Sequence, residues 1–407
     1  MAGRIVPNVP IVRKRRSPSQ RPGYNPRLQM KNTACVILFL LACLGAHAQS
    51  LPGSAEPPSL SSKAYLLLDF QSGRVIASRG ADDRIEPASL TKLMTAYVVF
   101  DALRQKRLTL AQRIPVSEHA WRAPGSRMFL EPGSQPTVEQ LLNGLIVQSG
   151  NDAAVALAEA TGGSESAFVN LMNREAARMG LRNSRFSNAT GLPDAQHYSS
   201  AADIVRIADA IIREFPQYFP MYSMREYRYN DITQYNRNKL LGRDPHVDGM
   251  KTGFTESAGF CLVATAERGG RRLISVVIDA GSDNGRAAES QRLLNYGFEQ
   301  FETVRLYASG QSVHRIPIWK GVDDIIPAGF SEDLFVTVPR GLSNRLSATL
   351  ESMQPLLAPI RSGQAVGKLR LTFDDQTYGE YPVLALESVS VANMFVRAWH
   401  SLRLLFN

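Results

Sequence analysis

The sequence predicts an α+β fold, because strand patterns lie at both ends of residues 63–302 and helical patterns fill the middle. Residues 64–70 and 74–77 alternate as a hairpin. Residues 259–266 and 272–278 form two further antiparallel strands joined at Gly269-Gly270. Between the two pairs, residues 101–245 are predicted to be mostly helical, because several segments have apolar residues at helical spacing. Strands at both ends of the sequence with helices between them are typical of this class.

The first 48 residues predict an export signal. The chain has a net charge of +9, and residues 1–48 contain eight Lys or Arg and no acid, which leaves +1 for residues 49–407. This distribution excludes a basic nucleic-acid-binding domain. An apolar run over 33–45 ends at Ala46-His47-Ala48, a small-x-small cleavage pattern. We expect residues 1–48 to be a signal peptide, with residues 1–29 either an upstream-start artefact or a long n-region.

Cysteine usage excludes a disulfide scaffold. Cys35 and Cys43 lie in the leader, so Cys261 is the only cysteine of the mature chain. Leu40 to Cys43 loosely resembles a lipoprotein box, which is the weaker interpretation because the Ala-x-Ala site follows directly. The sequence contains no metal-ligand or nucleotide motif, so we expect neither a metal nor a cofactor.

The remaining elements follow in order. Residues 49–62 are a Pro/Ser-rich linker, and a helix with a buried face follows Pro87. Further helices are predicted at 138–146, 153–160, 201–213 and 287–301. From residue 303 to 387 short strands recur between turn signals, at 315–319, 334–338, 346–350 and 369–373, which predicts a small all-β domain.

Residues 388–407 predict a separate amphipathic helix. At 100° per residue one face collects seven apolar side chains, namely Met394, Phe395, Ala398, Trp399, Leu402, Leu405 and Phe406. Arg397 and Arg403 lie on the other face. We interpret the helix as an anchor in the plane of a membrane interface, in preference to a helix docked on the β-domain.

Ser89-Leu90-Thr91-Lys92 is the first chemical motif. Ser89 lies in the first turn of the predicted helix, and Lys92 lies three residues on, on the same face. A serine hydroxyl becomes a nucleophile when a base takes its proton, and a neutral lysine can be that base. A serine near a helix start with a solvent-facing lysine is the alternative, since one S-x-x-K is expected by chance in a chain of this length.

Two further motifs complete the set. Ser149-Gly150-Asn151 lies in a tight connection between helices, and Lys251-Thr252-Gly253 begins a strand. A lysine and a threonine there can bind a carboxylate, and the glycine lets substrate backbone approach the strand. Asn151 has the alternative role of a helix cap. Ser282-Asp283-Asn284 also fits S-x-N, but we interpret it as a loop.

The order S-x-x-K, S-x-N, K-T-G resembles penicillin-binding proteins and class A β-lactamases. From about Lys63 to the C-terminus the chain is most similar to the low-molecular-weight D-alanyl-D-alanine carboxypeptidases, the penicillin-binding protein 5/6 group. The resembling stretches are 87–95, 148–154, 188–192 and 247–253, with 358–360 and 363–367 in the β-domain. The resemblance implies a penicillin-binding/β-lactamase-like catalytic domain over 63–302.

The resemblance also implies the role of each residue. Ser89 would attack the D-Ala-D-Ala carbonyl of a peptidoglycan stem peptide and Lys92 would act as general base, with Ser149 as proton relay and Asn151 orienting the peptide amide. Lys251, Thr252 and Gly253 would recognise the terminal carboxylate, with Arg237 or Arg286. The backbone N–H of Phe254 would complete the oxyanion hole, although the family often has histidine there. β-Lactams would acylate Ser89.

A lysine base requires a lowered pKa. Against a reference near 10.4, a second cation such as Lys251 at about 4 Å costs roughly 4 kcal/mol, or about three pKa units, before burial adds its own effect. A DD-endopeptidase is the second interpretation, followed by a β-lactamase and a non-enzymatic wall-binding scaffold. We expect the protein at the periplasmic face of the cytoplasmic membrane; the sequence leaves a homodimer open.

Overall fold

The structure is a computed structural model that describes residues 11–13 and 51–405. The expected cleavage site, most of the leader and Phe406 lie outside the described residues. The chain divides into two compact units at residues 303 and 304. We call residues 51–303 the N-terminal unit and residues 304–405, with the strand β1 (Ile11–Arg13) that pairs in parallel with β13, the C-terminal unit.

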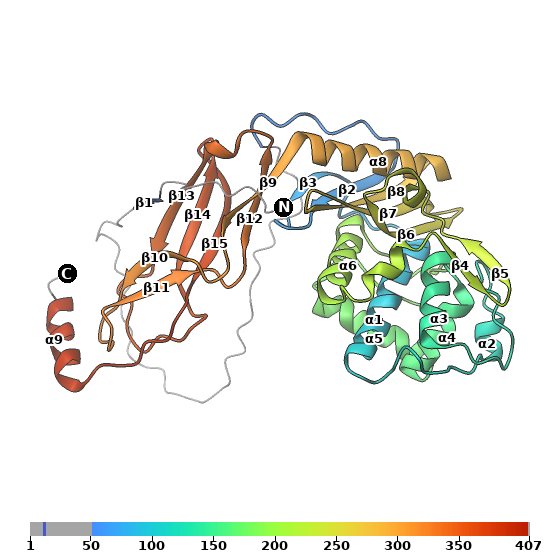
Figure 1. The fold of residues 1–407 in the computed structure, drawn as a ribbon, viewed down its shortest axis with the longest axis horizontal. Coiled ribbons are helices and arrows are strands. Elements are labelled where there is room, and N and C mark those ends of the chain that lie inside the picture. The colour runs from blue at the N-terminus through green and yellow to red at the C-terminus, as the bar shows by residue number, and fades with distance from the viewer. Residues whose placement is uncertain (1–10, 14–50, 406–407) are drawn as a thin grey trace. The chain divides into compact units, whose positions relative to one another are not determined.

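The N-terminal unit is built on a five-stranded antiparallel sheet in the order β3-β2-β8-β7-β6. Its strands are β2 (Ala64–Asp69), β3 (Val75–Arg79), β6 (Val247–Thr255), β7 (Gly259–Arg268) and β8 (Arg271–Ala280). The pairing of β2 with β8 joins the two ends of the unit, as the α+β prediction requires. Helix α8 (Asp283–Gln300) covers one face, on which the short helix α7 (Leu240–Arg243) also packs, and the longer helices lie on the opposite face (Figure 1).

The segment between β3 and β6 is mostly helical and contains one short hairpin. Its elements are η1 (Ala88–Thr91), α1 (Lys92–Arg104), α2 (Glu118–Trp121), α3 (Val138–Asn143), η2 (Gly144–Gln148), α4 (Asn151–Gly162), α5 (Glu165–Arg178), α6 (Ala201–Glu214), η3 (Phe219–Ser223), β4 (Glu226–Tyr229), β5 (Ile232–Tyr235) and α7 (Leu240–Arg243). The sequence analysis missed β4 and β5. Helix α1 is buried at twelve of its thirteen residues, so it is a core helix with no polar face.

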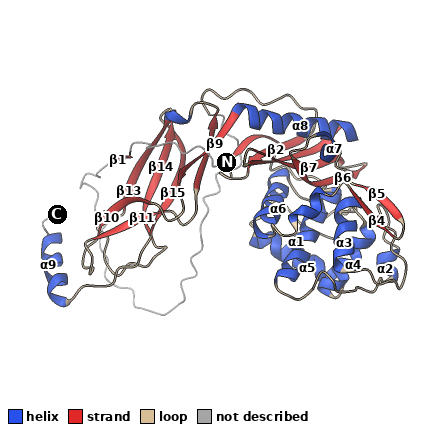
Figure 2. Ribbon diagram, viewed as in Figure 1, coloured by secondary structure: helices blue, strands red, loops and turns tan. Residues whose placement is uncertain are grey.

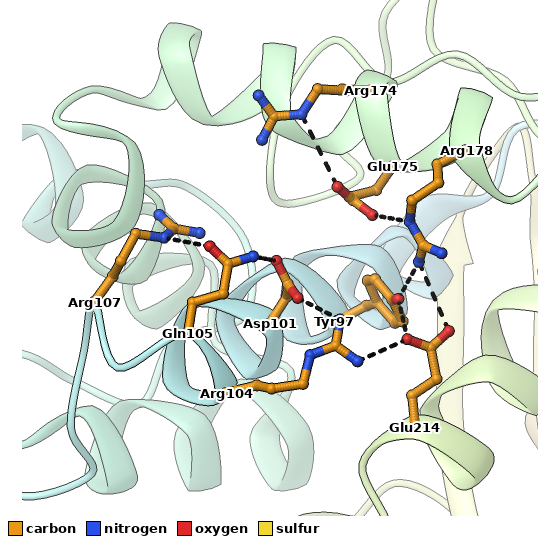
Figure 3. A network of polar contacts seen from close by, with 9 residues as sticks. All are labelled: Tyr97, Asp101, Arg104, Gln105, Arg107, Arg174, Glu175, Arg178 and Glu214. Carbon is orange, nitrogen blue, oxygen red and sulfur yellow. Dashed lines mark hydrogen bonds and ion pairs between the residues drawn. The ribbon is translucent and has the colours of Figure 1, made fainter. Parts of the chain in front are cut away.

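A polar network fastens α1 to α5 and α6 (Figure 3). The Tyr97 hydroxyl donates to Glu214 at 2.8 Å, and Arg178 donates to the same hydroxyl. Arg104 also reaches the Glu214 carboxylate, at 3.0 Å. The network satisfies a tyrosine hydroxyl at the edge of the core and fixes the helix that begins with Lys92.

Helix α8 corrects one expectation. The prediction of a loop at Ser282-Asp283-Asn284 was wrong, because Ser282 is the N-cap of α8 and its hydroxyl accepts from the Gly285 N–H at 2.9 Å. A serine followed by acidic and amide residues satisfies free N–H groups at a helix start as readily as it forms a turn. The helix therefore begins four residues before the predicted start at 287.

The C-terminal unit is all-β until its last helix, as predicted (Figure 2). A six-stranded sheet runs in the order β1-β13-β14-β15-β11-β10, and β9 pairs with β12. The strands are β9 (Phe301–Tyr307), β10 (Ser312–Pro317), β11 (Ile325–Gly329), β12 (Leu334–Pro339), β13 (Leu346–Ser352), β14 (Ala365–Phe373) and β15 (Gln376–Ala385), with a short η4 (Ser343–Arg345). The alternating burial of β13 and β14 places one face of the sheet in a core.

Helix α9 (Met394–Leu404) lies at the end of the described residues and contacts this unit through His400 and through Arg403, whose guanidinium lies 5.7 Å from the ring centroid of Trp319. The Nδ1 atom of the buried His400 accepts from the Lys320 N–H at 2.8 Å, and its ring lies edge-on to Trp319 at 5.6 Å. Residues Val389 and Val391 form β-bridges with Ile360 and Gly321, so the chain leading to α9 is part of the β-domain. Within residues 11–13 and 51–405, no helix combines the length and apolarity needed to span a membrane.

Candidate active site

The turn that carries Ser89 is a 3-10 helix, not the first turn of an α-helix as the sequence suggested. In a 3-10 helix residues i and i+3 eclipse each other. Lys92, the first residue of α1, therefore lies directly over the half-buried Ser89, with Nζ 3.1 Å from Oγ. Ala88 has a left-handed φ of +46°, an unfavourable conformation that the fold enforces just before Ser89.

The Lys92 amine is buried and has two other oxygen partners. It donates to Asn151 Oδ1 at 2.6 Å and to the Thr190 carbonyl oxygen at 2.6 Å. A neutral amine has two N–H donors and one lone pair. When those donors are occupied by the two oxygens, the lone pair is left for the Ser89 proton. The geometry thus suits Lys92 as a base.

The electrostatics also favour the neutral amine. Burial first, and then the nearby Arg237 cation, lower the pKa of Lys92 from 10.5 to about 7, although Asp152 opposes the shift. The sequence analysis gave the charge of Lys251 the larger part. In the structure removal from water is the main cause, because a buried ammonium loses its hydration.

Ser149 and Lys251 form a second buried pair beside the first. Ser149 has a left-handed φ of +66° between η2 and α4. The Lys251 amine, at the centre of β6, donates to Ser149 Oγ at 2.9 Å and to the Thr252 carbonyl oxygen at 2.9 Å. Burial and then the charges of Lys92, Arg237 and Arg286 hold the pKa of Lys251 well below its usual range. The predicted lysines are therefore electrostatically coupled.

Asn151 is fixed at both ends of its amide. Its Oδ1 accepts from Lys92, its Nδ2 donates to the Pro124 carbonyl oxygen, and its backbone N–H donates to Ser126 at 2.7 Å. The next residue, Asp152, is fully buried and accepts from the N–H groups of Met128 and Leu130. The loop over 124–130 is thus bound to the S-x-N motif.

Strand β6 passes close to the nucleophile turn, and Gly253 makes this approach possible. A Cβ added there would lie 3.2 Å from the Pro87 carbonyl oxygen and 3.3 Å from the Leu90 nitrogen. Thr252 beside it is buried. Phe254 is 50% exposed and stacks on Phe260 at 4.3 Å, so its ring forms a rim of the site.

The two candidate arginines occupy different positions. Arg237 is exposed, and within residues 11–13 and 51–405 it has no hydrogen-bond or ion-pair partner, although its charge lowers the pKa of both Lys92 and Lys251. Arg286 is buried and already bound to Gly253 and Asp283. Arg237 is consequently the better placed of the two to receive a carboxylate from solvent.

Sequence reasoning assigned no role to the turn over 188–192. Asn188 Oδ1 accepts from the N–H groups of Thr190 and Gly191, which orients the Thr190 carbonyl toward Lys92. Gly191 has φ +83°, and a Cβ there would lie 1.8 Å from the Ala88 carbonyl oxygen. The stretch Asn-Ala-Thr-Gly has the composition of an ordinary turn, so only the fold reveals its contact with the lysine.

His197 is a second residue that the sequence analysis missed. Its Nδ1 accepts from the Ser187 N–H at 3.2 Å, so Nε2 carries the proton and donates to Thr91 Oγ1 at 2.8 Å. Burial lowers the pKa of His197 to about 4, despite the opposing effects of Asp194 and Glu86. A neutral histidine therefore stabilises η1 through its hydrogen bond to Thr91.

Comparison with known proteins agrees with this geometry. The profile of the D-alanyl-D-alanine carboxypeptidase family matches residues 52–282, and that of the penicillin-binding protein 5 C-terminal domain matches residues 301–391. This chain belongs to the D-alanyl-D-alanine carboxypeptidase family. It is 38% identical over 389 residues to the D-alanyl-D-alanine carboxypeptidase DacA of Escherichia coli (strain K12), covering 92% of this chain and 95% of that protein.

Solved structures share this fold over most or part of the chain. Penicillin-binding protein 5 from Haemophilus influenzae superposes with a TM-score of 0.80 at 37% identity, covering 83% of this chain and 99% of that one. Penicillin-binding protein D2 from Listeria monocytogenes, in its ampicillin-bound form, has a TM-score of 0.55 at 29% identity and covers 60% of this chain and all of that one. The fold and family predicted from the three motifs are confirmed.

Proposed function

We propose that Ser89 carries out the acyl transfer of a serine-type D-Ala-D-Ala carboxypeptidase, the activity to which the family and its relatives point. The observation that supports Ser89 is the 3.1 Å contact between its hydroxyl and a buried lysine whose pKa is lowered to about 7. A base with a pKa near the working pH is half deprotonated and still basic enough to take a proton.

The acylation step follows from the contacts. The Ser89 oxygen attacks the carbonyl carbon of the penultimate D-alanine as its proton passes to Lys92. The resulting oxyanion is held by the N–H groups of Ser89 and Phe254. Ser149, hydrogen-bonded to Lys251, delivers its proton to the leaving nitrogen, so the C–N bond breaks and D-alanine departs. The proton that Lys92 took from Ser89 then restores the Ser149 hydroxyl and leaves Lys92 neutral.

The second half-reaction reverses the roles. Water attacks the ester while the neutral Lys92 takes a proton from it, and Lys92 then returns this proton to the Ser89 oxygen as the ester C–O bond breaks. Thr252, Lys251 and the exposed Arg237 would bind the terminal carboxylate, because all three lie at or beside the K-T-G strand. A β-lactam acylates Ser89 by the same attack, but its leaving nitrogen stays tethered, and a slow deacylation would leave the enzyme blocked.

The competing activities lack support of the same kind. The relatives named above are carboxypeptidases, and the chain has the C-terminal β-domain of penicillin-binding protein 5. A β-lactamase has no need of this domain. The lowered Lys92 pKa and the complete set of motifs argue against a scaffold without turnover. A DD-endopeptidase remains the second candidate, because it would use the same residues on a longer substrate.

The decisive variant is Ser89→Ala. We expect it to abolish both labelling by a fluorescent penicillin and D-alanine release from a D-Ala-D-Ala peptide, since it removes the hydroxyl that lies 3.1 Å from the Lys92 amine. Ser257→Ala is a matched control, because Ser257 is an exposed serine bonded to Glu86. Labelled Ser89→Ala protein on a denaturing gel would disprove the assignment.

We also propose that α9 attaches the protein to the outer surface of the cytoplasmic membrane. At 100° per residue, Met394, Phe395, Trp399, Leu402 and Leu405 lie on the half of the helix opposite the docked His400, whereas the less exposed Val396 lies on the side of His400. Phe395 is 82%, Leu405 79% and Met394 74% exposed. A helix docked to complete a core would bury these side chains, so their outward orientation supports an apolar phase as their partner.

A truncation tests the attachment. Burying a Leu or Phe side chain contributes roughly 1.5–3 kcal/mol, so deletion of residues 394–407 should lower binding to anionic lipid vesicles more than about tenfold. Because Val389 and Val391 pair within the β-domain, the deletion should begin at 394 and leave them in place. Peptidase activity should stay within about twofold of the full chain. Equal pelleting of the two proteins, or loss of activity, would contradict the proposal.

A further inference from the structure

We propose that Arg286 is a positioning residue for the oxyanion hole, acting through the peptide unit between Gly253 and Phe254. The inference rests on the proposed roles of Ser89 and of the Phe254 N–H. It assigns to Arg286 a function different from the carboxylate binding considered for it from the sequence.

The first observation is where the guanidinium lies. Arg286 is in the first turns of α8 and is buried under the sheet. Its Nη1 donates to the Gly253 carbonyl oxygen at 2.9 Å and contacts the Cys261 carbonyl oxygen at 3.4 Å, and its Nη2 pairs with Asp283. Both ends of the guanidinium are therefore occupied by the protein.

The second observation is what lies at the other end of the same peptide. The Gly253 oxygen and the Phe254 N–H belong to one planar trans peptide, so they point in opposite directions. The oxygen lies on the side of β7, because the same Nη1 also reaches Cys261 on that strand. The Phe254 N–H consequently points to the free edge of β6, where Gly253 passes Pro87 and Leu90 of the nucleophile turn.

A charged donor on this carbonyl has two effects on the N–H. It fixes the plane of the peptide, so the N–H does not turn away as the carbonyl carbon becomes tetrahedral. It also polarises the amide, which makes the N–H a stronger donor in a buried environment. Both effects grow in the transition state, when negative charge forms on the substrate oxygen. Arg286 should therefore raise kcat more than it lowers KM.

The aromatic rim adds to the same arrangement. The Arg286 guanidinium lies 5.6 Å from the ring centroid of Phe260, and Phe260 stacks on Phe254. Side chain and backbone of Phe254 are thus both held from the side of α8. A phenylalanine can serve at this position because the donated group is its backbone N–H.

The experiment compares Arg286→Gln and Arg286→Lys with Arg268→Gln. Arg268 is a matched control, since it is a guanidinium on β7 bonded to Asp244 and Asn295 and stacked on Phe298, seven residues from Cys261. The readouts are kcat and KM for a D-Ala-D-Ala peptide and for its C-terminal amide, thermal stability, and the infrared carbonyl stretch of the penicillin acyl-enzyme. The stretch reports hydrogen bonding to the ester oxygen.

For Arg286→Gln we expect kcat to fall roughly tenfold for both peptides, with KM within about twofold, and the carbonyl band to move to higher wavenumber. Arg286→Lys should be intermediate, and Arg268→Gln should match the wild type. An unchanged band with a raised KM for the free acid alone would mean that Arg286 binds the carboxylate. An unchanged band with lower thermal stability would mean a structural role only; both outcomes overturn the proposal. Failure of the wild type to be acylated would instead disprove the proposed function.

Discussion

The two units place their polar and apolar groups in opposite ways. The N-terminal unit buries ionisable and amide side chains, including Lys92, Lys251, Asn151, Asp152 and Arg286. In the described C-terminal unit the buried polar side chains are Thr337 and His400. The exposed large apolar side chains show the reverse distribution, with four in the N-terminal unit and eleven in the C-terminal one.

This contrast separates two physical tasks. A buried lysine is costly, yet burial is the main reason why the pKa of Lys92 is lowered to about 7 beside Ser89. An exposed apolar side chain is also unfavourable, unless a second apolar phase covers it. We infer that the N-terminal unit gives up stability for chemistry and that the C-terminal unit gives it up for attachment. The following predictions test each half of this comparison.

The largest effect should come from Lys92→Met, which keeps the volume and removes the amine. We expect kcat/KM to fall on the order of 10³-fold or more, because the base for Ser89 is lost. Penicillin labelling of Ser89 should slow by a similar factor. Lys63→Met is a suitable control, since Lys63 is an exposed lysine of the same unit. A Lys92→Met variant with activity within tenfold of the wild type would place the base elsewhere.

The same variant should change how stability depends on pH. The pKa of Lys92 is lowered in the folded protein to about 7 from 10.5, so between these values the unfolded chain binds more protons than the folded one. The contribution of Lys92 to the free energy of unfolding therefore rises with pH across this window, by at most about 1.4 kcal/mol per pH unit. In Lys92→Met this contribution should vanish. Denaturant melts at pH 7, 8 and 9 measure it, and equal slopes in both proteins would contradict the lowered pKa.

The proposed catalytic residues could be recognised from the sequence because they belong to ordered motifs, but the contacts that would make them reactive could not. Ser89, Lys92 and Lys251 are recognisable by spacing alone. The Thr190 carbonyl and His197 act from a distant turn, through contacts that only the folded chain creates. Likewise the sequence suggested a charge effect on Lys92, whereas burial, a property of the whole core, is the main cause.

The boundaries of helices and strands were likewise predictable where they depend on local sequence patterns. The strands β7 and β8 and the helix α6 were predicted nearly to their ends, because their apolar period and glycine turn are local signals. The hairpin β4–β5 was missed, since its four-residue strands are polar and mostly exposed. The orientation of α9 could not be predicted either, because it depends on a histidine that docks on a loop 80 residues away.

A smaller effect should follow from Arg237→Gln. Arg237 is an exposed cation whose charge lowers the pKa of Lys92 and of Lys251. Its loss should lower kcat/KM for a free-acid peptide roughly tenfold, the value of a charge-assisted hydrogen bond, and affect the peptide amide less. The acid limb of the pH–rate profile should move to higher pH, because the pKa of Lys92 rises. Arg228→Gln, an exposed arginine on β4 paired with Asp231, is the control; an unmoved acid limb would show that Arg237 does not act on the base.

The smallest effect should come from His400→Ala, which tests the proposed attachment role of the C-terminal unit. His400 binds the Lys320 N–H and Trp319 but faces away from the exposed apolar side chains of α9. The variant should lower the free energy of unfolding by about 1 kcal/mol, because the hydrogen bond to Lys320 is lost. If the exposed apolar side chains provide the attachment, binding of the variant to anionic vesicles should change by less than about threefold.

A paired variant, Phe395→Ser with Trp399→Ser, gives the contrast needed to interpret His400→Ala. It leaves the docking histidine in place and removes two exposed rings, so vesicle binding should drop more than about tenfold while thermal stability stays unchanged. Co-sedimentation and thermal melts of both variants measure the two quantities separately. If His400→Ala lost vesicle binding as fully as the paired variant, the docking of α9 on the β-domain would be required for membrane binding. Helix α9 would then be a structural element of the β-domain and not an independent membrane anchor.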